Sequence, residues 1–122
     1  MTKLVLWVDR FDDCAEFYRR LLDGRLQHAS EEFVEVCSES SCVLLHRMPA
    51  EWSSEISSPP ELREQNPMKP VFEVKSIDAA RIAVSGLAGR IFAEAQEQTH
   101  GSSRYCDGFD PDGNIIQLSQ GI

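Results

Sequence analysis

Two short runs in the first half of the chain concentrate residue types that could do chemistry. Residues 33–37 read Phe-Val-Glu-Val-Cys and residues 42–46 read Cys-Val-Leu-Leu-His, with four polar residues between them. Because every second position along these runs is aliphatic (34, 36, 43 and 45), we expect two strands joined by a turn. A carboxylate, an imidazole and two thiols would then share one face of the hairpin, and the opposite face would be aliphatic.

An imidazole beside a carboxylate is a common arrangement for a general base. His46 could fill this role if Glu35 or Glu73 lay within hydrogen-bonding distance of its ring. We favour the simpler interpretation, a half-exposed histidine at the end of a strand, and His28 and His100 are weaker candidates still. A further alternative is a metal site, because His46, Glu35 and Glu73 together offer three nitrogen or oxygen donors for zinc or iron.

Four cysteines stand at positions 14, 37, 42 and 106. They show neither CxxC spacing nor histidine partners at zinc-finger intervals. We expect thiols in a reducing cytoplasm, where they would serve as small buried apolar groups. Cys37 and Cys42 lie opposite each other in the expected hairpin, so they could form a cross-strand disulfide under oxidation.

The elements that position these residues begin with the first module, residues 1–46. The β-rich run at its start predicts a strand, and Asp12 or Asp13 can cap the helix that follows, with Asp13 and Glu16 at capping-box spacing. Gly24 is expected to end the helix as its left-handed residue. The buried stripe of this helix would comprise Cys14, Phe17, Tyr18, Leu21 and Leu22. The expected strands are residues 3–8, 25–29, 33–37 and 42–46.

The second module, residues 69–122, repeats the order of the first. Ser76 is expected to cap its helix and Gly86 to end it, and residues 96–102 are expected to form a polar loop. Its expected strands are residues 69–74, 90–95, 104–109 and 114–119. Both modules are thus predicted as β-α-β-β-β, which gives a single α+β domain over residues 1–122.

A connector, residues 47–68, joins the two modules. It is rich in proline, serine and glutamate and shows no sustained periodicity. A stretch of this length without regular structure is unusual in a compact domain. Trp52 and Ile56 lie four residues apart, so a short amphipathic turn serving as a lid or a partner contact is one interpretation, and a plain linker is the other.

The repeated order of elements resembles that of the vicinal oxygen chelate superfamily. Two stretches of sequence carry the same resemblance: Phe17-Tyr18 with Leu21-Leu22-Asp23-Gly24, and the closing run Phe109-Asp-Pro-Asp-Gly-Asn-Ile-Ile-Gln-Leu118. This group includes glyoxalase I, extradiol dioxygenases, fosfomycin-inactivating enzymes and bleomycin resistance proteins. The resemblance implies two βαβββ modules that form a cup-shaped mixed sheet with helices on the outside. We interpret residues 110–114 as a plain tight turn with Gly113 at positive φ.

The metal enzymes of that superfamily hold a divalent ion near the start of the first strand and on the fourth strand of each module. The resemblance carries these positions to Lys3, Leu44, Lys69 and Gln117. A lysine ammonium repels a cation, leucine offers no donor, and a glutamine carbonyl is a weak, neutral one. We therefore expect no metal and no cofactor.

Alternation along the strands predicts which side chains line the cup. Trp7 and Phe33 would offer flat apolar faces, and the polar members would orient an organic ligand. In the alternative, Lys3 and Lys69 neutralise Glu35 and Glu73 across a filled interior. The expected lining is Trp7, Phe33, Glu35, Leu44, His46, Glu73 and Gln117.

The overall charge limits the classes of partner. Twelve basic against twenty acidic residues give a net charge of −8, which disfavours nucleic acid and anionic membranes, and no apolar run is long enough to span a bilayer. The leading hypothesis is a cytoplasmic, metal-free protein, resembling the bleomycin resistance proteins, that binds a small organic ligand and forms a homodimer. The acidic charge is compatible with a cationic ligand. The alternatives are a metal-dependent lyase, isomerase or dioxygenase of the glyoxalase type, and a structural or regulatory module with a filled cup.

Overall fold

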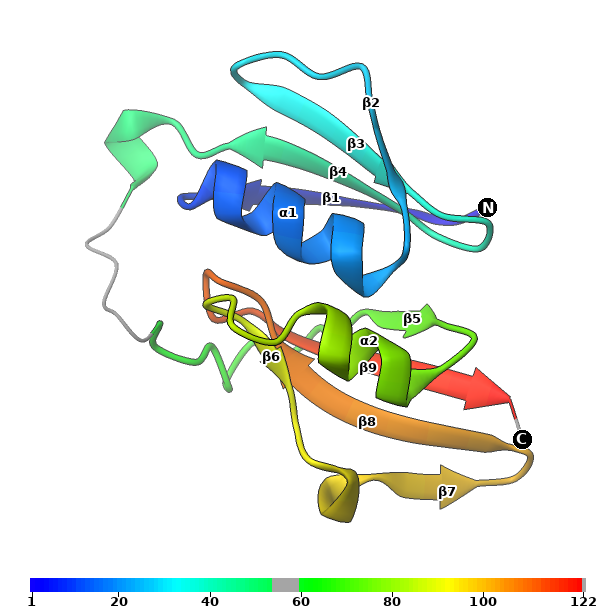
Figure 1. Cartoon of the computed structure of the whole chain (residues 1–122). Helices are drawn as coiled ribbons and strands as arrows, with labels where there is room; N and C mark the ends of the chain where they lie inside the picture. The colour runs from blue at the N-terminus through cyan, green and yellow to red at the C-terminus, as the bar shows by residue number, and fades with distance from the viewer. Residues whose placement is uncertain (54–59, 122) are drawn as a thin grey trace.

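The computed structural model describes residues 1–53 and 60–121 and contains both expected modules (Figure 1). The first module consists of β1 (Lys3–Val8), α1 (Phe11–Leu21), β2 (Arg25–Gln27), β3 (Phe33–Cys37) and β4 (Cys42–Arg47). The second consists of β5 (Val71–Glu73), α2 (Ile77–Ala83), β6 (Arg90–Ile91), β7 (Gln98–His100), β8 (Ser103–Phe109) and β9 (Ile115–Gly121). Single 3-10 turns lie at Ala50–Trp52 and Glu94–Gln96.

Each module forms its own mixed sheet. The strand order is β1-β4-β3-β2 in the first sheet and β5-β9-β8-β6 in the second, and β7 pairs with β8. In both sheets the first strand runs parallel to the last one, and the remaining pairs are antiparallel. The predicted α+β class is therefore confirmed.

Strand β7 corrects the expectation of a loop over residues 96–102. All three of its residues are polar and exposed, so no apolar alternation marks it in the sequence. Its backbone pairs with β8, with Gln98 opposite Tyr105 and His100 opposite Ser103. Backbone hydrogen bonds rather than side-chain burial define this strand, and they leave no periodic signal.

The expected hairpin forms in the predicted register. Phe33 pairs with His46, Glu35 with Leu44 and Cys37 with Cys42. The aliphatic face is buried, and its members are Val34, Val36, Val43 and Leu45. Because neither α1 nor α2 covers the opposite face (Figure 1), we call it the open face of the first sheet.

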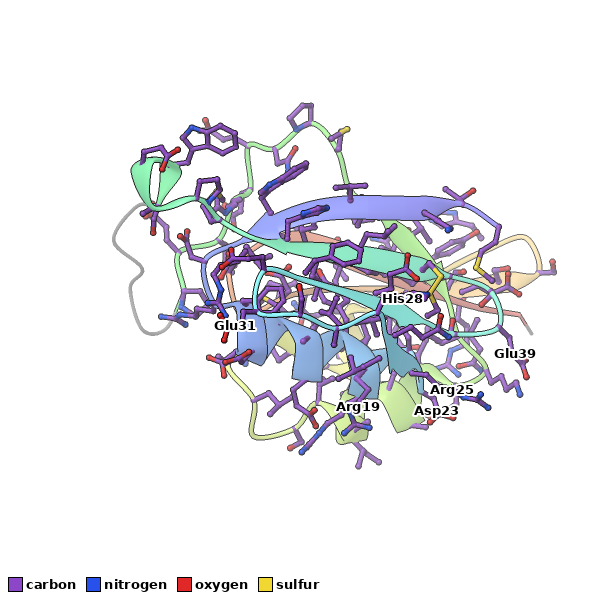
Figure 2. The ribbon with its side chains drawn as sticks, turned by 90° about the horizontal axis from the view of Figure 1, so that it is seen from above. Arg19, Asp23, Arg25, His28, Glu31 and Glu39 are labelled. Carbon is purple, nitrogen blue, oxygen red and sulfur yellow. A yellow bond between two sulfur atoms is a disulfide. The ribbon has the colours of Figure 1, made fainter. Side chains whose placement is uncertain are left out.

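A disulfide joins Cys37 to Cys42 across the ends of β3 and β4, beside the turn that carries Glu39 (Figure 2). The expectation that all four cysteines remain thiols is therefore wrong for this pair. Direct pairing in the register brings their Cα atoms to 4.2 Å, within reach of a bond. Cys14 and Cys106 are buried thiols, as expected.

Both helices lie on the side where the two modules meet. In Figure 1, α1 lies beneath the first sheet and α2 lies over the second, and the two helices contact each other. The predicted stripe of α1 is buried in a single core that also takes Phe72, Ile77 and Ile116 from the second module. The Tyr18 ring meets the Phe72 ring edge-on at 5.9 Å between centroids. The two modules therefore share one core.

The start of α1 is capped from the other module. The helix begins at Phe11, so neither Asp12 nor Asp13 occupies the cap position, and Glu16 pairs with Arg19 and Arg20 instead of closing a capping box. The Asp112 carboxylate accepts hydrogen bonds from the backbone N–H groups of Asp9 at 2.7 Å and Arg10 at 3.0 Å. A carboxylate at this helix end also interacts favourably with the helix dipole.

The neighbouring aspartate makes the second contact between the modules. Asp110 is fully buried and accepts a hydrogen bond of 2.6 Å from the Tyr18 hydroxyl on α1. It also accepts hydrogen bonds from the backbone N–H groups of Asp112 and Asn114. Burial raises the pKa of Asp110, and the hydrogen bonds from Tyr18 and Asn114 oppose that rise. Residues 110–114 form the expected turn, with Gly113 at φ 85°, and they also clamp the modules together.

The other predicted helix signals are only partly correct. Ser76 caps α2 by accepting from Ala79 N–H at 3.0 Å, and Gly86 takes the expected positive φ of 85° after the helix. After α1, however, Asp23 is the left-handed residue, with φ 49°. Gly24 is required for a different reason: a Cβ there would lie 2.9 Å from the carbonyl oxygen of Cys37.

The described part of the connector packs against the clamp. Arg63 N–H donates to Gly113 O at 2.9 Å, and a Cβ on Gly113 would lie 2.0 Å from Glu61 O. Trp52 lies in a 3-10 turn and is 65% exposed. Ile56 lies outside the described residues, so the expected amphipathic turn stays a prediction. No helix among the described residues has the length and apolarity to cross a membrane.

A charge cluster joins α2 to the β7–β8 layer of the second module. The Glu97 carboxylate is 8% exposed, accepts from Arg81 Nη2 at 2.6 Å, and also pairs with Arg104. Burial raises the pKa of Glu97, but hydrogen bonds from the two guanidinium groups outweigh it, so the net shift is downward. The cluster therefore stabilises the fold above the unfolded-state pKa, and this contribution is lost as the pH falls through the folded-state pKa.

Replacing the cap of α1 provides a test of the clamp. We expect Asp112→Ala to lower the free energy of unfolding by about 1–2 kcal/mol, because two N–H groups at the helix start lose their acceptor. Urea denaturation measures this change. Asp12→Ala is the matched control and should cost about 0.5 kcal/mol or less, since that exposed side chain contributes only through the helix dipole. Equal losses in the two variants would contradict the capping role of Asp112.

The charge cluster predicts a specific acid sensitivity. We expect Glu97→Gln to lower the free energy of unfolding at neutral pH by about 1–3 kcal/mol, because two charged hydrogen bonds are lost. Below the ordinary glutamate pKa of 4.5 the stabilities of wild type and variant should converge. Denaturation midpoints measured across the acid range test this, and a difference that persists undiminished would contradict it.

Candidate functional site

An aromatic stack occupies the open face of the first sheet. The Trp7 ring stacks on the His46 ring at 4.8 Å between centroids and 16° between planes. On the other side of His46, the Phe33 ring lies 4.8 Å from the His46 ring between centroids. The three residues occupy one register row across β1, β4 and β3, which sets their spacing. Trp7 is 44% exposed, so part of its ring is available for contact.

The carboxylates expected beside His46 lie elsewhere. The Glu35 side chain is 19% exposed, and its carboxylate lies 3.9 Å from His28 Nε2. Within the described residues, neither Glu35 nor Glu73 hydrogen-bonds to the His46 ring. His46 thus stacks on the Trp7 ring and contacts the Phe33 ring at a tilt of 56°, without the carboxylate that would support a general base.

A polar triad occupies the face of the second sheet that neither α1 nor α2 covers, which we call the open face of the second sheet. Asp107 accepts from Lys69 Nζ at 3.1 Å and from Gln117 Nε2 at 3.0 Å. Val71 pairs with Gln117 in the register and is 50% exposed beside them. Our sequence analysis overlooked Asp107, although alternation along residues 103–109 would have assigned it to the face that holds Gln117.

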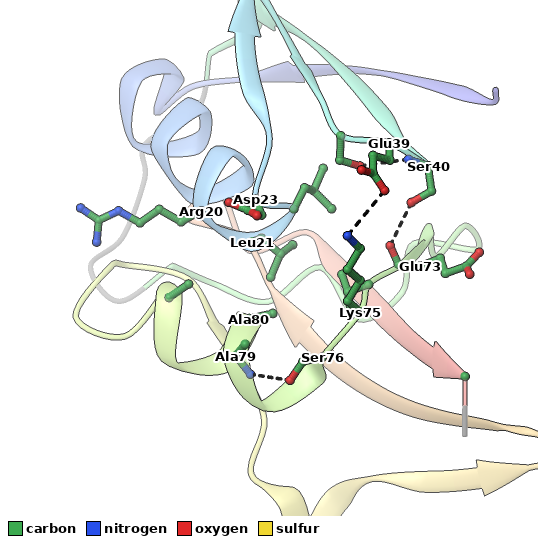
Figure 3. Close-up of a pocket in the computed structure, with 15 residues that line it drawn as sticks. Arg20, Leu21, Asp23, Glu39, Ser40, Glu73, Lys75, Ser76, Ala79 and Ala80 are labelled. Carbon is green, nitrogen blue, oxygen red and sulfur yellow. Dashed lines mark hydrogen bonds and ion pairs between the residues drawn. The ribbon is translucent and has the colours of Figure 1, made fainter.

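The predicted lining residues therefore fall into two groups on two sheets. Trp7, Phe33, Glu35, Leu44 and His46 lie on the first sheet, and Glu73 and Gln117 lie on the second. Within the described ranges, ring contacts join Trp7, His46 and Phe33, and no hydrogen bond or ion pair joins the side chains of one group to those of the other. The backbone carbonyl of Glu73 contacts the first module, accepting from the Ser40 hydroxyl at 3.2 Å (Figure 3). One chain thus supplies an aromatic half-site and a polar half-site.

The residues at the superfamily's metal positions do not suit a divalent cation. Lys3 and Leu44 lie on the first sheet, and neither side chain offers a suitable donor. On the second sheet, Lys69 and the amide nitrogen of Gln117 both donate to Asp107, which leaves one carboxylate beside a positive charge. The described residues contain no group of three His, Cys, Asp or Glu side chains that could hold a metal. We therefore derive no metal-dependent step.

A groove of about 710 Å³ lies at the seam between the modules (Figure 3). The end of α1, the β3–β4 turn and the start of α2 form its walls, with small alanine side chains along α2. An exposed ion pair of 3.7 Å between Lys75 and Glu39 spans it. The sequence analysis did not predict this groove, because its walls come from segments that are distant in the chain.

The fold of this chain is similar to those of several solved structures. The chain superimposes on a glyoxalase/bleomycin resistance protein from Albidiferax ferrireducens T118 with a TM-score of 0.71 and 16% identity, covering 100% of this chain and 98% of that one. For a glyoxalase/bleomycin resistance protein/dioxygenase family enzyme from Burkholderia phytofirmans PsJN, the TM-score is 0.69 and the identity 13%, over 98% of this chain and 97% of that one. For the fosfomycin resistance protein FosX from Listeria monocytogenes, the TM-score is 0.66 and the identity 12%, over 100% of this chain and 93% of that one. Comparison with protein-family models and with curated proteins finds no match.

These likenesses define the class of fold. Over essentially its full length, the chain has the paired-module α+β fold of the glyoxalase, bleomycin resistance and dioxygenase proteins. The expected resemblance to the vicinal oxygen chelate superfamily is thus confirmed at the level of fold. At identities of 12–16% the likeness shows the fold alone, so the function has to be argued from this chain's own residues.

Proposed function

We propose that this protein binds a small, flat organic ligand without a resident metal, using the aromatic stack of the first sheet as its platform. The observation that carries the proposal is the 44% exposure of Trp7 in a stack with His46 on a sheet face that neither α1 nor α2 covers. An aromatic surface left partly open in this way favours stacking with a planar ring system.

Charge favours a cationic or neutral ligand. The chain carries a net charge of −8, and Glu35 lies on the same face as the stack. A cation above an exposed tryptophan ring gains further from its quadrupole. The names of the related structures include bleomycin resistance and fosfomycin resistance, which supports a small organic molecule as the kind of ligand.

A homodimer would complete the site. Each chain has an aromatic half-site on one sheet and the Lys69–Asp107–Gln117 triad on the other, and each open face exposes an apolar residue, Val5 at 47% and Val71 at 50%. A two-fold axis can place the aromatic half-site of one chain against the polar half-site of its partner, twice. Two equivalent cups, each lined by two chains, would result.

The compartment that we propose is the cytoplasm, on the grounds given by the sequence. In that compartment the disulfide between Cys37 and Cys42 would meet dithiol reductants.

Ligand binding is tested by calorimetric titration with flat aromatic cations, proflavine among them, and with an anionic acridine carboxylate. We expect the cations to bind and the anion to bind more weakly. Trp7→Ala should weaken cation binding by about tenfold or more, since truncating a stacked aromatic anchor removes most of its contact area. Trp52→Ala is the matched control, because it removes the chain's other tryptophan, and it should leave affinity unchanged.

Fluorescence provides a second measurement of the same binding. In the Trp52→Phe variant, Trp7 is the remaining tryptophan, so ligand binding should quench its emission. Absence of binding across the panel, or equal affinity in Trp7→Ala and wild type, would contradict the aromatic platform. Tight binding of one equivalent of iron, zinc, nickel or manganese would favour the metal-dependent alternative.

Oligomeric state is tested independently by sedimentation equilibrium. We expect a mass of twice the 13.7 kDa of one chain. Val71→Asp should raise the dissociation constant by about tenfold or more, because a charge would be buried unpaired at the interface. Ile82→Asp, at a residue 75% exposed on α2, is the control and should not change it. A monomeric wild-type protein at micromolar concentrations would contradict the shared cup.

A further inference from the structure

The Cys37–Cys42 disulfide lies where exchange chemistry is accessible. Both side chains lie on the open face of the first sheet, at its end away from the aromatic stack. Cys37 is partly exposed, whereas Cys42 is 6% exposed. An incoming thiolate would therefore reach the sulfur of Cys37 more readily than that of Cys42.

Two basic residues flank the pair in the same row of the sheet. The register places Lys3 opposite Cys42 and Arg25 opposite Cys37. Directly paired residues project from the same face of a sheet, with Cβ atoms about 5 Å apart. Both basic residues are exposed along their strands. Nearby positive charge stabilises a thiolate, so each sulfur has a group that favours its release as a leaving group.

The other two cysteines provide a contrast within the same chain. Cys14 and Cys106 are 0% and 1% exposed. Burial is the main cause of a raised pKa at both thiols. They are therefore poor nucleophiles and poorly accessible, and any exchange chemistry would be confined to the pair at 37 and 42.

Hydrogen bonds close the hairpin turn in addition to the disulfide. Its turn closes through Ser38 N–H to Ser41 O at 2.8 Å, and the Ser38 hydroxyl accepts from the N–H groups of Ser40 and Ser41. A disulfide stabilises a fold more when it closes a longer loop, and these cysteines are five residues apart. Opening and closing the bond is thus compatible with a folded protein in both states.

We propose that Cys37 and Cys42 form a redox-active site that exchanges with a dithiol reductant. A thiolate of the reductant attacks Sγ of Cys37, forms a mixed disulfide there and releases the Cys42 thiolate beside Lys3, which then takes a proton from water. The second thiol of the reductant then attacks the reductant's first sulfur, which is bonded to Cys37 in the mixed disulfide. This closes the reductant's disulfide and releases Cys37, which takes up a proton. The chain ends as two thiols and the reductant as a disulfide, so electrons and protons balance.

The redox state is connected to the seam between the modules. The turn closed by the disulfide carries Ser40, which donates to Glu73 O, and Glu39, which pairs with Lys75 (Figure 3). This turn forms one wall of the groove of about 710 Å³. Reduction would loosen that wall while leaving the aromatic stack in place at the far end of the sheet.

Thiol labelling of the native, full-length protein tests the proposal. We expect no labelled thiols before reduction and two per chain after treatment with excess dithiothreitol, with an unchanged far-ultraviolet circular dichroism spectrum and full reversal by oxidised dithiothreitol. Labelling that appears only after denaturant is added, or reduction that unfolds the chain, would overturn it. The Cys37→Ser/Cys42→Ser double variant should fold and show no labelling in either state.

Charge removal separates a reactive disulfide from one that is merely exposed. We expect Lys3→Gln with Arg25→Gln to slow reduction, because losing the nearby positive charges raises the pKa of the leaving thiol and a thiol of higher pKa leaves more slowly. Arg90→Gln removes a positive charge from an exposed position on the second sheet, outside the row and away from the turn, and it should not change the rate. Equal rates in wild type and in both variants would overturn the role of the flanking cations.

Discussion

The two aspartates of the turn at residues 110–114 hold the molecule together. Asp110 receives the Tyr18 hydroxyl inside the core, and Asp112 receives the two backbone N–H groups at the start of α1. Both acceptors belong to the second module and all these donors belong to the first. This buried polar connection fixes how the helices meet, and the position of the helices leaves one face of each sheet uncovered. The two half-sites are therefore a consequence of how the modules are joined.

Local sequence signals predicted most of the fold correctly. The register of the β3–β4 hairpin, the buried stripe of α1, the Ser76 cap and the positive φ of Gly113 each depend on residues close together in the chain. The errors come from interactions between distant segments. Asp12 and Asp13 are plausible caps by local rules, yet an acceptor about a hundred residues away, Asp112, takes that role.

The candidate site shows the same division. Alternation placed Trp7, Phe33 and His46 on one face, and the structure stacks them there. It could not show that Glu73 and Gln117 belong to a second, separate face, because this depends on how the two modules pack. The disulfide was predicted only in part. The pairing of Cys37 with Cys42 follows from the register, but formation of the bond depends on redox conditions, which no sequence pattern indicates.

The capping of α1 by Asp112 also has a consequence for synthesis of the chain. The N–H group of Asp9 and its acceptor are 103 residues apart, so the first helix leaves the ribosome long before its cap exists. Until residues 110–114 emerge, Tyr18 also lacks its buried acceptor and Phe17 lacks much of its core. A domain stabilised in this way completes its folding only after residues 110–114 have been translated, and its two modules mature together instead of in sequence.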